Sequence, residues 1–214
     1  MKLILILSLF LTTNVFASEH SYRDIQKDWD VINYKMDDSK KEEAFKALIE
    51  KAILIEKEKP NSAEVKIWEA IVRASYAGSL GGLSSMVNAL PQMDKAKVLL
   101  EKAGKIDKEV LEGAYYTTLG SFYYMVPGGI LSWGDKIKAK KLLQTAVKKY
   151  PNNIDSNYYM GGYYIEIGES KKAIPFLKKA IHSKKIKGRN VFYKGRKAEA
   201  RELLMQANET GFFD

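Results

Sequence analysis

Apolar residues recur every three or four positions along most of the chain, which is the spacing of one face of an α-helix. In the first such segment the recurring residues are Tyr22, Ile25, Trp29, Ile32 and Met36. They predict a helix over residues 21–35. Strictly alternating apolar and polar positions, which mark strands, do not recur, so the pattern predicts an all-α fold.

Sequence signals for helix ends divide the following part of the chain. Ser39 and Glu42 have the spacing of a capping box, which predicts that a second helix starts there, and Pro60 is expected to close it. A third helix is predicted over residues 62–77. The glycines that come next predict a loop that ends near Pro91.

One pattern occurs twice between residues 116 and 180. Four residues at offsets 0, 3, 4 and 7 are Tyr116, Leu119, Gly120 and Tyr123 in the first copy, and Asn157, Met160, Gly161 and Tyr164 in the second. Three residues at offsets 0, 4 and 7 follow in each copy, and recur once earlier: Ala139, Leu143, Ala146; Ala173, Leu177, Ala180; Ala96, Leu100, Ala103. Each set lines one helix face, with small residues where two helices approach closely, so each copy predicts a helix pair.

The two copies differ in the length of the turn between their helices. The first copy carries seven extra residues, in a stretch over 126–134 that contains Pro127, Gly128, Gly129 and Trp133. Helices are predicted on either side of it, over 113–125 and 135–150. Ser170 is expected to cap the second helix of the second copy, and a final helix over 195–209 is expected to cover the open end of the stack.

These residues resemble the tetratricopeptide repeat (TPR) family. The family's large aromatic, Leu, Gly and Tyr match Tyr116, Leu119, Gly120 and Tyr123, and its Ala, bulky residue, Ala and Pro match Ala139, Leu143, Ala146 and Pro151. Asn157 and Val72 depart from the pattern, and the match weakens before residue 60. The resemblance implies helix-turn-helix repeats stacked into a short right-handed superhelix, with inserted loops and a C-terminal capping helix.

The inserted stretch also resembles a motif of uncharacterised exported repeat proteins of Gram-negative bacteria. In architecture and compartment the chain is similar to auxiliary T-components of TRAP transporters, which are periplasmic repeat proteins that pair with a solute-binding subunit. This second resemblance implies an alternative role as a transporter auxiliary that holds or passes a hydrophobic ligand.

The N-terminal segment has the features of an export signal. Met1 and Lys2 precede an apolar run from Leu3 to Leu11, and Val15 and Ala17 are placed as a cleavage signal. We therefore expect a signal peptide over residues 1–17, a single repeat domain over 18–214 and a periplasmic location, with an uncleaved anchor as the alternative. The chain has no cysteine, which excludes disulfides, a lipid-modified cysteine and thiolate metal ligands.

If the TPR register holds, the first helices line an inner groove. The residues that would then face the groove are Glu69, Arg73, Tyr76, Thr117, Ser121, Tyr124, Asp155 and Tyr158. Tyrosine suits binding because a rigid apolar ring carries a hydroxyl that finds hydrogen-bond partners. The alternative is that these rings only pack between helices.

The insertion with Trp133 is a second candidate for binding. Long loops in compact repeats are often functional, and an aromatic residue beside proline and glycines can serve as a lid or an anchor. Alternatively, Trp133 fills a gap between repeats while Asp135 caps the next helix.

The chain is basic, with a formal net charge of +9, and its positive charge is densest between residues 178 and 201. The candidate basic patch consists of Lys184, Lys185, Lys187, Arg189 and Arg196. It would attract an anionic membrane surface or an acidic partner. The alternative is a solvated face, and we expect no nucleic-acid target because no recognition motif is present.

Catalytic signals are absent from the sequence. The two histidines, His20 and His182, are far apart, and no metalloprotease, serine hydrolase or phosphate-loop motif occurs. We expect neither catalysis nor a cofactor nor a metal. The sequence favours an exported binding or adaptor protein that docks a peptide, a protein segment or a small apolar ligand. The transporter auxiliary and a scaffold of an envelope complex are the alternatives, and the oligomeric state stays open.

Overall fold

The computed structural model describes residues 21–130, 132–185 and 187–211, and within them every regular element apart from one isolated bridge is an α-helix. The all-α prediction is therefore confirmed. In chain order the helices are α1 (Tyr22–Lys35), α2 (Asp38–Glu58), α3 (Ala63–Ser79), α4 (Gly82–Ile106), α5 (Val110–Met125), α6 (Lys136–Lys149), α7 (Ile154–Glu166), α8 (Ser170–His182) and α9 (Asn190–Thr210). The predicted signal peptide lies outside the described residues.

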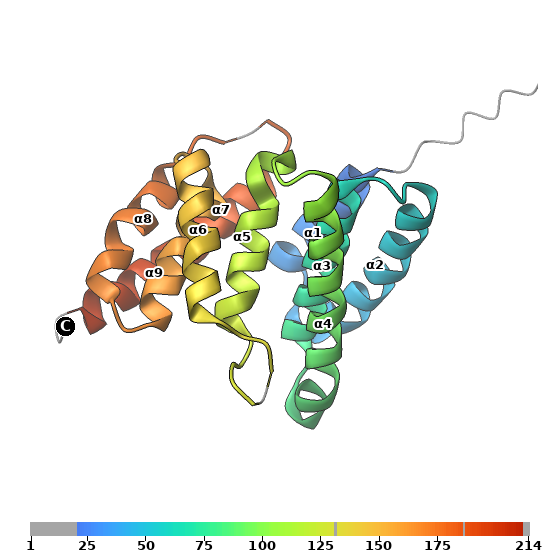
Figure 1. Cartoon of the computed structure of the whole chain (residues 1–214), viewed down its shortest axis with the longest axis horizontal. Helices are drawn as coiled ribbons and strands as arrows, with labels where there is room; N and C mark the ends of the chain where they lie inside the picture. The colour runs from blue at the N-terminus through green and yellow to red at the C-terminus, as the bar shows by residue number, and fades with distance from the viewer. Residues whose placement is uncertain (1–20, 131, 186, 212–214) are drawn as a thin grey trace, which may run out of the picture.

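Consecutive helices form antiparallel pairs that stand side by side, from α8 at one end of the molecule to α2 at the other (Figure 1). The two copies of the sequence pattern make the same contact. A methyl group added at Gly120 would lie 2.9 Å from Leu143, and one added at Gly161 would lie 2.6 Å from Leu177. In both pairs glycine therefore lets the first helix approach the leucine of the second closely.

The five odd-numbered helices form a closed ring. Contacts run from α1 to α3, α3 to α5, α5 to α7 and α7 to α9, and α9 returns to contact α1. The even-numbered helices pack on the outside of this ring, each against its neighbours in the chain. The first and last helices of the described chain are thus neighbours in space, and the five odd-numbered helices surround a common central region.

The predicted helix ends are partly correct. Ser21 caps α1 in a capping box with Asp24, and Asp135 caps α6 through hydrogen bonds from two backbone amides. The predicted box at Ser39 is wrong, because α2 begins at Asp38, so that Ser39 is already helical. Ser170 is likewise the first residue of α8 and makes no N-cap.

Two helices are longer than the pattern predicted. The chain from Gly82 to Pro91 is not a loop but the first part of α4, which contains Pro91. A proline inside a helix costs about 3 kcal/mol, which the packing of α4 along α3 offsets. The last helix starts at Asn190, five residues earlier than predicted, because Phe192 and Tyr193 are buried in the ring.

Candidate functional site

The ring of odd-numbered helices surrounds a cavity of about 670 Å³. Its lining comes from α1 between Tyr22 and Val31, from the first halves of α5, α7 and α9, from the middle of α3, and from residues 187–189 before α9. The connection from α8 to α9 lies at the opposite end of the molecule from the loop between α5 and α6 (Figure 1). The cavity therefore opens far from the Trp133 insertion.

One wall of the cavity is aromatic. Trp29 of α1 packs edge-on against Trp68 of α3, with ring centroids 5.8 Å apart, and lies 6.4 Å from Phe192 of α9. The indole nitrogen of Trp29 donates a hydrogen bond to the hydroxyl of Ser75 at 2.7 Å. Because each ring is held by its neighbours, this wall is rigid before any ligand arrives.

A buried arginine forms the wall between α7 and α9. Nε of Arg196 lies 2.9 Å from a carboxylate oxygen of Asp155, Nη1 donates to Glu199 at 2.7 Å, and Nη2 donates to the hydroxyl of Tyr159 at 3.3 Å. The guanidinium also stacks 4.3 Å above the ring of Tyr158. Burial acts to lower the pKa of Arg196, but the surrounding phenol and carboxylates raise it well above its ordinary value, so the group stays charged.

A second arginine joins the start of α9 to α1. Arg189 donates from Nη2 and Nε to the two carboxylate oxygens of Asp30, at 2.5 and 3.2 Å. Its guanidinium lies 3.9 Å from the ring centre of Phe192. Burial raises the pKa of Asp30, and the hydrogen bond from Arg189 opposes that rise. This pair connects residues 159 positions apart and closes the ring.

The backbone at the start of α5 is left-handed. Leu111, Glu112 and Gly113 have φ angles of 55°, 52° and 70°. Glycine accepts this conformation readily, whereas the two residues with side chains are strained by roughly 1 kcal/mol each or more. A side chain at position 113 would also overlap the ring of Tyr150. Leu111 and Glu112 line the cavity, so part of its edge is a strained turn.

Exposed basic residues stand at the mouth of the cavity. Arg23 and Lys27 come from the first turns of α1, and Lys187 comes from the connection before α9. An adjoining open hollow of about 340 Å³ shares Glu112, Asn153 and Tyr193 with the cavity and is lined also by Lys184 and Lys185. The side-chain amide of Asn153 donates to Glu112 at 2.6 Å.

The residues predicted to face a groove do not come together in one site. Thr117 and Asp155 line the cavity. Tyr158 lies under Arg196, and Ser121 donates to the Thr118 carbonyl within α5.

Tyr124 is enclosed between α5, α7 and α9. A methyl group added at Gly162 would meet both the hydroxyl of Tyr124 and the side chain of Leu203 in α9. Burial raises the pKa of Tyr124 well above its ordinary value. Helix α9 thus covers the part of the inner face in which Tyr124 was expected to meet a ligand.

Three more predicted groove residues lie on α3 outside the cavity. Glu69 and Arg73 form a buried ion pair at 2.7 Å, and Arg73 also donates to Gln92 of α4 at 2.9 Å. Burial raises the pKa of Glu69, while Arg73 opposes the rise. Tyr76 packs beside the hydrophobic cluster that contains Trp29. These side chains join α3 to its neighbours.

Trp133 joins the insertion to α4. Its indole nitrogen donates to Asp94 at 2.6 Å, Nζ of Lys97 lies 4.7 Å from its ring, and its ring meets Tyr123 edge-on at 5.6 Å. These are the contacts of a residue that fills a gap between helix pairs. Trp133 does not line the cavity.

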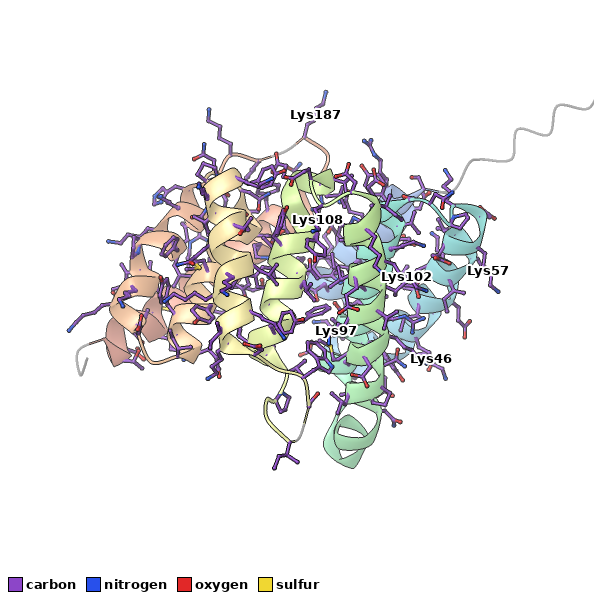
Figure 2. The ribbon with its side chains drawn as sticks, viewed as in Figure 1. Lys46, Lys57, Lys97, Lys102, Lys108 and Lys187 are labelled. Carbon is purple, nitrogen blue, oxygen red and sulfur yellow. The ribbon has the colours of Figure 1, made fainter. Side chains whose placement is uncertain are left out.

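The predicted basic patch divides into two parts. Arg189 and Arg196 point into the ring and are paired with carboxylates. Lys184, Lys185 and Lys187 are exposed, and Figure 2 shows Lys187 projecting from the edge of the molecule at the α8–α9 connection. The five residues therefore form no single surface. Lys187 stands at the cavity mouth, and Lys184 and Lys185 line the adjoining hollow.

The aromatic wall was not predicted as a site. Trp29 was correctly expected on the inward face of its helix, but nothing in the pattern indicated that Trp68 and Phe192 would join it. Asp30 follows Trp29 directly and is only 6% exposed, although it is charged. A carboxylate beside an inward tryptophan was the available signal, because a buried charge needs a partner.

Within residues 21–130, 132–185 and 187–211, no helix is long and apolar enough to cross a bilayer, and no cluster of three or more His, Asp or Glu residues is placed to hold a metal ion. No protein-family model matches the chain, and no curated protein is significantly similar to it. The function is therefore inferred from the geometry of the cavity.

Proposed function

We propose that this protein binds a small, partly apolar ligand in the cavity of the helix ring and performs no chemistry on it. The supporting observation is a partly open cavity of about 670 Å³ whose walls carry Trp29, Trp68 and Phe192. Cavities of about 300 to 1,000 Å³ with apolar walls and a few placed polar groups are typical of small-molecule sites. Walls held by ring contacts and ion pairs lose little entropy on binding.

The position of α9 favours a small ligand over an extended peptide. An open repeat groove offers its whole inner face, whereas here α9 packs over Tyr124 and Tyr158. The free space that remains reaches only part of the way along the helices, because no residue of α5 beyond Thr118 and none of α7 beyond Tyr159 lines it. A compact molecule fits this space, and a long peptide along the inner face does not.

We further propose that the scaffold is a TPR-like stack in an exported, periplasmic protein. The same glycine–leucine approach in the pairs α5–α6 and α7–α8 supports the repeat assignment. The pattern of residues 1–17 supports export. In this interpretation α9 does more than cap the stack, because it returns across the inner side to α1.

A second candidate is the auxiliary role in a TRAP-type transporter. The observation that favours it is again the cavity with its aromatic wall, since holding or passing a hydrophobic ligand requires such a space. A solute-binding subunit that copurifies with the protein would distinguish this role from independent binding.

Titration with N-phenyl-1-naphthylamine (NPN) and its sulfonated analogue 1-anilinonaphthalene-8-sulfonate (ANS) tests the proposed function. Both fluoresce strongly in apolar sites, and we expect one bound probe per chain together with quenching of Trp29 and Trp68. The variant Ala114→Trp narrows the cavity, so it should weaken binding of either probe at least tenfold. Ala198→Trp, at an exposed position of α9, is the matched control and should bind normally.

Two results would reject the proposed function. One is that neither probe binds to the folded protein. The other is that Ala114→Trp and Ala198→Trp bind equally well, because the probes would then occupy a site outside the cavity. Circular dichroism of each variant verifies that the comparison is made between folded proteins.

A further inference from the structure

We infer that the ligand of this cavity is an amphipathic anion, with its apolar part against the aromatic wall and its anionic group at the mouth. This inference rests on the proposed function and specifies the ligand class of that site. It follows from a difference between the interior of the cavity, where every guanidinium is paired with carboxylates, and its mouth, where positive charge is in excess.

Inside the cavity every guanidinium is paired with carboxylates. Arg189 binds both carboxylate oxygens of Asp30, and Arg196 contacts the carboxylates of Asp155 and Glu199. Two positive charges thus face three negative ones, so an anionic ligand group placed here would lose its hydration without a free positive partner. The interior therefore suits an apolar ring or chain.

The mouth carries an excess of positive charge. Arg23, Lys27 and Lys187 line it and form no ion pair with another described residue. The one acid at this edge, Glu112, offsets one of these charges. Lys184 and Lys185 of the adjoining hollow add two further positive charges. Five positive charges thus surround a single carboxylate, and an anionic ligand would supply the missing counter-charge.

The arrangement also excludes the other charge types. A cationic head group at the mouth would lie among like charges and gain nothing. A neutral head group would leave the excess charge unchanged and gain only the apolar contacts. The separation between an apolar interior and a basic mouth thus selects for negative charge at one end of the ligand.

The matched probes NPN and ANS test this inference, because they differ by the sulfonate. We expect ANS to bind about tenfold more tightly than NPN, which corresponds to about 1.4 kcal/mol and to the sum of a few partly exposed ion pairs. The preference should shrink at high salt, since exposed charges are screened. In competition, dodecanoate should displace NPN, whereas dodecyltrimethylammonium should not.

Two charge-matched variants locate the effect. Arg23→Gln/Lys27→Gln/Lys187→Gln should reduce the affinity for ANS about tenfold and change the affinity for NPN less than twofold. Lys46→Gln/Lys57→Gln/Lys102→Gln removes the same charge from exposed positions on α2 and α4, away from Lys187 (Figure 2), and should alter neither affinity.

The outcomes separate the two proposals. If NPN and ANS bind equally well, or if both triple variants lose ANS to the same degree, the anion inference is wrong while the cavity function stands. If neither probe binds, the cavity function itself is wrong. A membrane is the other source of amphipathic anions, so sedimentation with phosphatidylglycerol-containing vesicles completes the test. Vesicle binding without displacement of NPN by dodecanoate would make the mouth a membrane-surface contact and overturn the inference.

Discussion

Replacing Gly195 by alanine is expected to loosen the contact that closes the helix ring. Gly195 of α9 lies directly against the ring of Tyr34 in α1, and a methyl group there would overlap three ring carbons. The tyrosine has little room to move. Its hydroxyl is 3.2 Å from Glu199, and its ring meets Trp29 edge-on at 5.6 Å.

Two opposing effects set the expected size of the change. Alanine is favoured over glycine inside a helix by about 1 kcal/mol. Overpacking a well-filled contact costs about 1–3 kcal/mol. Because the overlap is severe and the ring is held on two sides, we expect a net loss of roughly 1–2 kcal/mol in the free energy of unfolding. For a domain of this size that lowers the melting temperature by roughly 2–8 °C.

Gly78→Ala is the matched control, since no atom lies within 4 Å of the added methyl group at the end of α3. It should leave stability unchanged or raise it slightly. Urea unfolding of both variants, of Tyr34→Leu and of Tyr34→Leu/Gly195→Ala gives the comparison. Removing the ring should make the alanine tolerable, with a coupling free energy of about 1 kcal/mol or more. A Gly195→Ala protein as stable as the Gly78→Ala protein would refute the described packing of α9 on α1.

Two further predictions concern single contacts. Gly113→Ala should lower the free energy of unfolding by about 2–3 kcal/mol in urea titrations, because φ is 70° and the ring of Tyr150 occupies the space of the added methyl group. Gly168→Ala is the control, because its φ of 76° is similar but its surroundings are open, and it should cost only about 1 kcal/mol. Equal losses in the two variants would contradict the Tyr150 contact. Hydrogen bonds from Lys149, Tyr150 and Tyr116 lower the pKa of the Glu109 carboxyl from 4.5 to about 2. The stability that Glu109 contributes is therefore complete above about pH 4.5 and is lost as the pH falls through about 2. The stability difference between the protein and Glu109→Gln should shrink over this range, and a pH-independent difference would count against the cluster.

The helix pairs were predictable because their signals are local. Gly120 and Gly161, with Leu143 and Leu177, lie at helical spacings in the sequence, and the structure brings each glycine against its leucine. Asp135 was predictable as a cap for the same reason, since a cap contacts amides two and three residues ahead. The start of α4 was mispredicted because Gly82 and Pro91 are local breakers that tertiary packing overrode.

The candidate site was only partly predictable. Thr117 and Asp155 were expected to face a ligand and do line the cavity, and Lys187 of the predicted basic patch stands at its mouth. Tyr124 and Trp133 are residue types that are common in binding sites, but here they pack against other helices. The residue type determines which contacts a side chain can make, whereas its accessibility to a ligand depends on which helix covers it.

The sequence by itself determined that the chain forms α-helices in pairs, which side of each helix is buried, and where small residues permit close approach. These properties arise from interactions between residues a few positions apart. Only the tertiary structure decided that α9 returns to α1 and forms one wall of a cavity, through contacts such as that of Arg189 with Asp30, 159 positions away. The physical reason is that the path back to α1 depends on the summed rotation of every helix pair between them, which no local pattern of residues records.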